Sequence, residues 1–209
     1  MTTDPETEDR ILDAAHAVFL RSGTAGARMQ EIADEAGVNK ALLHYYFRSK
    51  DRLAEAVFQR AARGLFPVIL MTMASDAPIE EKVERVIQHE LDILSKSPQL
   101  PGYLLSEMHH HPERIEQLVT SIIGAAPSQV AGPILARLGA QIQEQVAAGT
   151  MRPIAPEQFM VNLVSLCIFP FAARPLLTVV LGMGPEGFDR LIEQRKRELP
   201  GFFLNALRP

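Results

Sequence analysis

The chain has 209 residues, of which 47% are hydrophobic and 22% charged, as in an ordinary globular protein with one large domain or two smaller ones. Its formal net charge of −4 argues against a broadly basic nucleic-acid-binding surface. The single cysteine, Cys167, excludes a disulfide framework within one chain and fits a reducing cytosol. The polar, acidic start MTTDPETEDR does not resemble a secretory signal, so we expect a cytoplasmic protein.

Helical periodicity begins close to the N-terminus. Ile11, Leu12, Ala15 and Phe19 would share one face of an amphipathic helix that ends at Gly23. The apolar residues Met29, Ile32, Ala33 and Ala36 give a second, short helix.

The next turn carries strong local signals. The second helix is predicted to stop at Gly37, because glycine readily adopts the left-handed conformation that a tight turn requires. Asn39 is a good N-cap for a third helix running to about Phe47. Ser49 would then cap a fourth helix, with Asp51 near its positive N-terminal end.

The remainder of the chain also reads as helical. Pro67 could kink or end the fourth helix. Further helices are predicted at about 78–95, 100–110, 113–123, 128–148, 156–181 and 185–206. We find no strand pattern of useful length and therefore predict an all-α protein, with a three-helix helix-turn-helix domain at residues 1–50 and a helical body at 51–209.

The most apolar stretch, residues 159–181, has the length of a membrane-spanning helix. It contains Asn162, Ser165 and Arg174 as well as two prolines, Pro170 and Pro175, which should bend it. We therefore interpret it as a buried helix or a subunit interface, and we expect no membrane association.

The third predicted helix has the features of a helix that reads the major groove of DNA. Residues 1–55 carry seven Lys or Arg and ten Asp or Glu, yet residues 39–50 contain three cations and no acid. Leu43 and Phe47 would pack on the first two helices, while Ala41, Leu42 and Tyr45 lie on the opposite side. DNA would meet a narrow positive strip, which predicts a modest salt dependence.

Residues at the tip and margin of this helix could contact bases. Ala41 would allow close approach, and Leu42 could touch a thymine methyl group. Lys40 and His44 could donate hydrogen bonds to guanine N7 or O6.

Neighbouring residues could contact phosphates. The hydroxyl groups of Tyr45 and Tyr46 have the necessary reach, and Lys50 with the first amides of the fourth helix would form an anion site. The same pattern also fits a small helical hairpin whose cationic edge is merely solvated, and the residues alone leave both interpretations open.

The segment AGVNKALLHYYFRSKDRL resembles the signature of the TetR/AcrR family of bacterial transcriptional regulators, which reads Ala-Gly-Val-Ser-x-Gly/Ala-x-Leu-Tyr-x-His-Phe-x-Ser/Asn-Lys-x-x-Leu. The opening helix, ILDAAHAVFLRSG, is also similar to the family's, and the resemblance covers about residues 8–57. The matching positions are Ile32, Ala33, Ala36, Gly37, Val38, Ala41, Leu43, Phe47, Ser49, Lys50 and Leu53.

The resemblance implies a set of DNA-binding residues. They are Arg28, Gln30, Asn39, Lys40, Ala41, Leu42, His44, Tyr45, Tyr46 and Lys50. Three departures bear on this set. Arg28 and Met29 replace a Thr pair that often caps the second helix and touches a phosphate. His44 stands where the family usually has Tyr, and Tyr46 stands where it usually has His. These departures make the operator sequence unpredictable.

The resemblance also implies that the C-terminal domain binds a small effector and forms a homodimer through the last two helices. We expect an apolar pocket with a few orienting polar groups, and an aromatic interface, although such residues often only fill a core. The candidate pocket residues are Phe66, Met71, Tyr103, Glu107, Met108, Phe159, Asn162 and Leu163. The candidate interface residues are Phe169, Phe171, Leu177, Val180, Phe202 and Phe203.

Other chemistry is poorly supported. His109, His110 and His111 lie about 100° apart on a helix and cannot all bind one metal ion, so we expect no metal and no cofactor. No catalytic motif occurs, so we expect no enzyme.

The resemblance implies a ligand-responsive repressor that binds a palindromic double-stranded DNA operator and is released by a small, hydrophobic effector of unknown identity. The alternatives are an activator or a ligand-independent regulator of the same fold, or a helical protein–protein interaction module.

Overall fold

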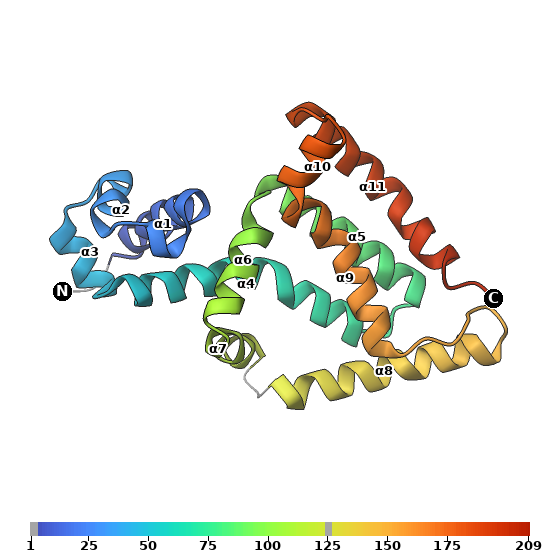
Figure 1. The fold of residues 1–209 in the computed structure, drawn as a ribbon. Helices are drawn as coiled ribbons and strands as arrows, with labels where there is room; N and C mark the ends of the chain where they lie inside the picture. Colours follow the sequence, from blue (N-terminus) through green and yellow to red (C-terminus); the bar gives the residue numbers. More distant parts are fainter. Residues whose placement is uncertain (1–3, 124–126) are drawn as a thin grey trace. The chain divides into compact units, whose positions relative to one another are not determined.

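The computed structural model describes residues 4–123 and 127–209, and within these ranges the chain is helical and contains no strand (Figure 1). The predicted all-α class is confirmed. The helices are α1 (Pro5–Gly26), α2 (Met29–Ala36), α3 (Lys40–Phe47), α4 (Lys50–Ala74), α5 (Ile79–Lys96), α6 (Leu100–His110), α7 (Glu113–Ile123), α8 (Pro127–Ala147), α9 (Pro156–Ala172), α10 (Arg174–Val180) and α11 (Pro185–Asn205).

The chain forms two compact units. Unit 1 takes residues 1–63 and 102–118, and unit 2 takes residues 64–101 and 119–209. Residue 50, where the sequence analysis placed a functional boundary, lies within unit 1. Helix α4 contributes its residues up to Arg63 to unit 1 because Leu53, Val57 and Phe58 are buried there.

The start of unit 1 follows from local capping. The Asp4 carboxylate accepts a hydrogen bond from the Glu6 amide at 3.2 Å, and Pro5 occupies the first turn of α1. The helical backbone breaks at Gly23, which has φ 67° and ψ 163°, and another turn then continues to Gly26. The prediction that the first helix ends at Gly23 is thus correct for the regular helix, and the added turn carries the chain toward α2.

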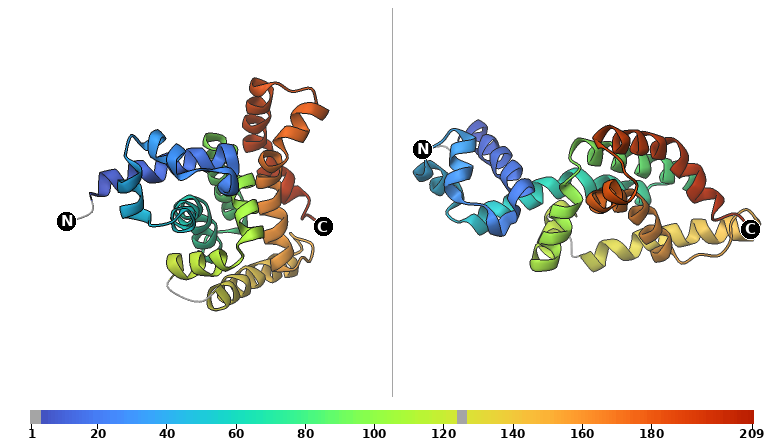
Figure 2. Two further views of the ribbon diagram at one scale, coloured as in Figure 1. Left: turned by 60° about the vertical axis from the view of Figure 1, so that its left-hand side comes forward. Right: turned by 45° about the horizontal axis from the view of Figure 1, so that its top comes forward.

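The core of unit 1 contains the residues that periodicity had assigned to it. Helix α1 packs on α2, and α2 packs on α3 (Figure 2). Ile11, Phe19, Ile32 and Leu43 have no more than 1% of their surface exposed. These contacts fix the position of the short helix α3, which has only eight residues and would be marginal alone.

Unit 2 is built on α5, which packs against both α9 and α11, while α8 packs against α9 (Figures 1 and 2). The aromatic rings of Phe159 and Phe203 meet edge to face with centroids 5.0 Å apart, and those of Phe171 and Phe188 do so at 5.6 Å. These ring pairs tie α9 to α11.

The predicted helix at 156–181 is two helices. Helix α9 ends at Ala172, and α10 leaves it at a bend of 67°. Pro175 lies in the first turn of α10, where a missing amide hydrogen costs nothing, so the chain starts a new helix there. Pro67, in contrast, does not end α4, which continues to Ala74.

Candidate nucleic-acid interface

The turn between α2 and α3 has the geometry that the sequence predicted. Gly37 adopts φ 64° and ψ 32°, and the Val38 amide donates to the Ala33 carbonyl at 3.0 Å. The Asn39 side-chain oxygen then accepts from the Leu42 amide at 2.7 Å, which starts α3. Helix α3 is therefore held at both its turn and its first residue.

The two faces of α3 divide as predicted. Leu43 and Phe47 are buried, whereas Lys40, Ala41 and His44 are exposed. Tyr45 has 51% of its surface exposed. Leu42 and Tyr46 are half-buried. Of the α3 side chains proposed to contact bases, Lys40, Ala41 and His44 thus lie on the solvent side of the helix, and contact of the set with DNA stays a prediction.

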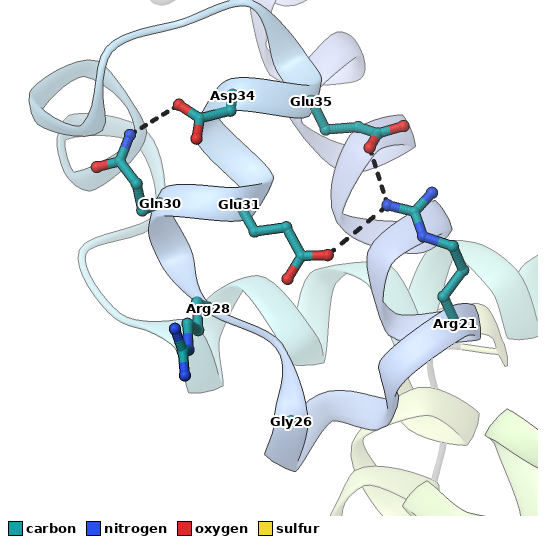
Figure 3. Close-up of a pocket in the computed structure, with 7 residues that line it drawn as sticks. All are labelled: Arg21, Gly26, Arg28, Gln30, Glu31, Asp34 and Glu35. Carbon is teal, nitrogen blue, oxygen red and sulfur yellow. Dashed lines mark hydrogen bonds and ion pairs between the residues drawn. The ribbon is translucent and has the colours of Figure 1, made fainter.

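An open groove lies beside the start of α2 (Figure 3). Arg28 forms the N-terminal boundary of α2 without a side-chain cap, so the loss of the cap expected from the sequence is confirmed. The Gln30 side-chain nitrogen donates to Asp34 at 2.8 Å, one turn further along α2. The lining residues are Arg21, Gly26, Arg28, Gln30, Glu31, Asp34 and Glu35.

Acidic residues of α2 neutralise Arg21 on one wall of this groove. The Arg21 guanidinium lies 2.8 Å from Glu35 and 3.8 Å from Glu31, as the dashed lines of Figure 3 show. The hydrogen bond that Arg21 donates to the Glu35 carboxylate raises the pKa of Arg21 and lowers the pKa of Glu35. In contrast, Arg28 makes no interaction with the other residues drawn. Of the two arginines that line the groove, Arg28 is therefore the one available to an anion.

Two of the predicted phosphate contacts have internal partners. The Tyr46 hydroxyl accepts from the Asp4 amide at 3.0 Å and donates to the Asp4 carbonyl at 3.3 Å. The Lys50 ammonium donates to the carbonyls of Ala25 and Ala27 at 3.1 and 3.2 Å. Both side chains position the backbone of unit 1, a role that the sequence did not indicate because their acceptors are main-chain atoms distant in the sequence.

Unit 1 also contains a buried ion pair that the sequence analysis missed. Arg114 is hydrogen-bonded to the Glu107 carboxylate, and both side chains are almost fully buried. The Thr24 hydroxyl donates to the other oxygen of Glu107 at 2.6 Å and so connects α1 to α6. Glu107 was predicted to orient a ligand, but its carboxylate is already satisfied.

The predicted pocket residues are distributed over both units. Tyr103 and Met108, like Glu107, belong to unit 1, and the Tyr103 ring stacks against Phe19 at 6.4 Å. In unit 2, Phe66 is half-buried and Met71 has 70% of its surface exposed. Effector binding by this set stays a prediction.

Three of the predicted pocket residues lie on α9, where two are buried and one is at the surface. Phe159 and Leu163 are fully buried in unit 2, and Phe159 packs on Phe203. Asn162 accepts a hydrogen bond from Gln158 at 2.8 Å on the surface of the helix. Their places indicate core packing for the first two and a surface pair for the third.

The predicted interface residues differ in their burial. Phe171 and Phe203 are buried in unit 2, which corrects their assignment to the interface, because they pack on Phe188 and Phe159 within the subunit. Leu177 is half-buried. The remaining predicted residues are exposed, together with four apolar neighbours. This exposed set is Val161, Phe169, Leu176, Val179, Val180, Leu181 and Phe202.

The residues considered for other chemistry show no arrangement that supports it. Burial raises the pKa of the Cys167 thiol to about 12, so little thiolate forms at neutral pH. Within the described ranges, no three His, Cys, Asp or Glu side chains are grouped so as to hold a metal ion. In the same ranges no single helix is long and apolar enough to cross a membrane, although the bent pair α9–α10 has the length and composition to do so.

Comparison with known proteins decides the family. The family described as "Bacterial regulatory proteins, tetR family" matches residues 11–57, from α1 into α4. The HTH-type transcriptional repressor SCO4008 of Streptomyces coelicolor is 31% identical over 141 residues, which are 63% of this chain and 69% of that protein. The chain belongs to the TetR family. It is a DNA-binding transcriptional regulator and not an enzyme.

Other relatives of this TetR-family regulator extend the comparison. The HTH-type transcriptional activator FasR of Mycolicibacterium smegmatis is 32% identical over 100 residues, 48% of this chain and 45% of that protein. The crystal structure of the TetR-family regulator PfmR from Thermus thermophilus matches with a TM-score of 0.67 over 94% of this chain and 98% of that chain, at 19% identity. The likeness to PfmR concerns the fold alone.

Proposed function

We propose that this TetR-family regulator is a cytoplasmic, homodimeric repressor that binds a palindromic operator and is released from it by a small, hydrophobic effector. The observation that carries the DNA-reading part is the exposed edge of α3, where Lys40, Ala41, His44 and Tyr45 face solvent on a helix fixed by the turn and the N-cap that precede it. In a two-fold dimer, two such helices would meet successive major grooves about one helical turn of DNA apart.

The DNA contacts can be tested on the duplex upstream of the protein's own gene, by fluorescence anisotropy. We expect Lys40→Gln to weaken specific binding about tenfold or more, because it removes a donor from the tip of the reading helix. Lys96→Gln is the matched control, since it removes the same charge from the exposed end of α5 in unit 2. Equal affinity of both variants and the wild type would contradict the placement of α3 in the groove.

The dimer proposal is supported by the exposed apolar residues of α9, α10 and α11. Phe202 and Val180 have 64% and 67% of their surfaces in contact with solvent, an unfavourable exposure that a second copy of the chain would remove. We expect the wild type to sediment as a dimer and Phe202→Asp as a folded monomer with much weaker operator binding. Gln143→Asp, which adds the same charge to an exposed position of α8, should stay dimeric.

Effector control would act by a population shift between a conformation that fits the operator and one that does not. Helices α4 and α6 each contribute residues to both units, so a movement in unit 2 has a covalent route into unit 1. Within unit 1, the Thr24–Glu107 hydrogen bond continues that route to α1. We expect Thr24→Val to change the effector concentration needed for release while preserving DNA affinity in its absence.

The sign of regulation is tested by transcription in vitro from the same promoter. A repressor should lower the transcript yield, and lipophilic compounds that dissociate the protein–DNA complex should restore it. An activator would instead raise the yield, and a ligand-independent regulator would not respond to any compound of the panel. Either of these results would overturn the repressor proposal while leaving DNA binding intact.

A further inference from the structure

One of the two ring nitrogens of His44 is hydrogen-bonded to a backbone carbonyl at the end of α3. His44 Nδ1 lies 3.2 Å from the carbonyl oxygen of Arg48, one turn further along. A carbonyl oxygen can only accept a hydrogen bond, so Nδ1 must carry the proton of this contact. The Arg48 amide in turn donates to the His44 carbonyl at 2.9 Å, which makes the contact between the two residues reciprocal.

The backbone at Arg48 explains why its carbonyl is in reach. Arg48 ends α3 with φ 53° and ψ −41°, and it is the one non-glycine residue with positive φ among residues 4–123 and 127–209. This conformation turns the chain out of the helix, so the Arg48 carbonyl does not continue the helical hydrogen-bond ladder. It is available to orient the ring of His44.

The protonation of one nitrogen decides the character of the other. A neutral imidazole has a single N–H, so a proton on Nδ1 leaves Nε2 with a lone pair and no hydrogen. Nε2 is then a hydrogen-bond acceptor on an exposed side chain of α3. This differs from the expectation that His44 donates to guanine, because the nitrogen that carries the proton is the one held by the Arg48 carbonyl.

An acceptor selects among bases by their major-groove edges. Adenine N6 and cytosine N4 present amine hydrogens, whereas guanine N7 and O6 and thymine O4 are themselves acceptors. We propose that His44 is a specificity-determining residue that accepts a hydrogen bond from the exocyclic amine of an adenine or a cytosine in each operator half-site. This rests on the proposed placement of α3 in the major groove.

Lys40 has the complementary chemistry one turn earlier on α3. Its ammonium group can only donate, and guanine is the base whose two major-groove acceptors suit it. Four residues of helix span about 6 Å, which corresponds to one or two base steps of about 3.4 Å. Each half-site should therefore combine a guanine read by Lys40 with an amine-bearing base, one or two steps away, read by His44.

The test is selection from a randomised duplex library at pH 8.5, where imidazole side chains are neutral, followed by sequencing. For the wild type we expect adenine or cytosine at the His44 position of each half-site, preferred over guanine by roughly 5- to 100-fold. His44→Ala should remove the preference at that position alone. His44→Lys, which can only donate, should change it to guanine, and His44→Glu, which can only accept, should retain an amine-bearing base.

His110→Ala is the matched control, since the His110 ring makes the same kind of contact, with the Ser106 carbonyl at 2.8 Å, but on α6. It should change no position of the selected sequence. The inference is overturned if the wild type selects guanine or thymine at the position that His44→Ala alters, or if His44→Ala alters no position. If the wild type enriches no sequence at all, the proposed operator binding fails, and the inference fails with it.

A second measurement requires no DNA. Nitrogen-15 NMR of the histidine rings in the free protein at pH 8.5 distinguishes the two neutral tautomers. We expect the proton of His44 on Nδ1 and a bare Nε2. A proton on Nε2 would overturn the inference even if the protein binds a specific operator.

Discussion

Glu90 of α5 provides a sharp test of the packing in unit 2. The residue is fully buried, and neither of its carboxylate oxygens has a hydrogen-bond partner among the described residues. Burial without a partner disfavours the charged form and raises the pKa of Glu90 from its usual 4.5 to about 8. Between these two values the folded protein keeps the proton, whereas the unfolded chain releases it.

The direction of the effect on stability follows from proton linkage. Because the unfolded state binds fewer protons in this window, the free energy of unfolding falls as the pH rises from about 4.5 to about 8. Each pH unit contributes about 1.36 kcal/mol, so from pH 5 to pH 7.5 Glu90 should cost about 3 kcal/mol. Glu90→Gln has nearly the same shape and no titration, and it should avoid this loss.

The assay is urea denaturation of both proteins at pH 5, 6, 7 and 7.5, at one protein concentration because dimerisation adds to apparent stability. The difference between Glu90→Gln and the wild type should grow by about 3 kcal/mol across this range, since the titrations common to both proteins cancel. Glu84→Gln, an exposed change on the same helix, is the control and should give no such growth. Parallel curves for Glu90→Gln and the wild type would refute a protonated Glu90 in the folded state.

Further predictions concern unit 1 and α4. Arg114→Met should lower the free energy of unfolding by about 3–5 kcal/mol in urea titrations, because it leaves Glu107 buried and unpaired, and a double variant with Glu107→Gln should recover part of that loss. Asn39→Ala should cost about 1 kcal/mol through loss of the α3 cap, measured in the same way, and an unchanged stability would show that the cap contributes nothing. Gly37→Ala should cost about 1–2 kcal/mol because of its positive φ, whereas Gly64→Ala within α4 should stabilise by about 0.5–1 kcal/mol; calorimetric melting checks the opposite signs.

Much of the DNA-reading element follows from the sequence because its signals are local. Gly37, Asn39 and Ser49 act on backbone groups a few residues away, and their turn and caps occur where they were predicted. Helical periodicity likewise assigned Leu43 and Phe47 to the buried face of α3. Such features need no knowledge of what packs against them.

The roles of charged and hydroxyl groups in unit 1 could not be predicted in this way. Lys50 looks like a phosphate ligand in the sequence, yet its ammonium donates to carbonyls more than twenty residues away. Glu107 looks like an orienting group of a pocket, yet Arg114 and Thr24 satisfy it. A long polar side chain can reach several partners, and which one is closest depends on the packing of distant helices.

The sequence by itself determined the all-α class, the helix boundaries of the DNA reader and the family, because each depends on neighbouring residues or on a short motif. Only the tertiary structure decided which apolar residues face solvent: on α9, Phe169 is exposed while Phe171 is buried against Phe188. It also placed the Arg48 carbonyl 3.2 Å from Nδ1 of His44, because that carbonyl lies at the end of a packed helix. Periodicity assigns a side chain to a face of a helix, but the neighbours of that face are set by long-range packing.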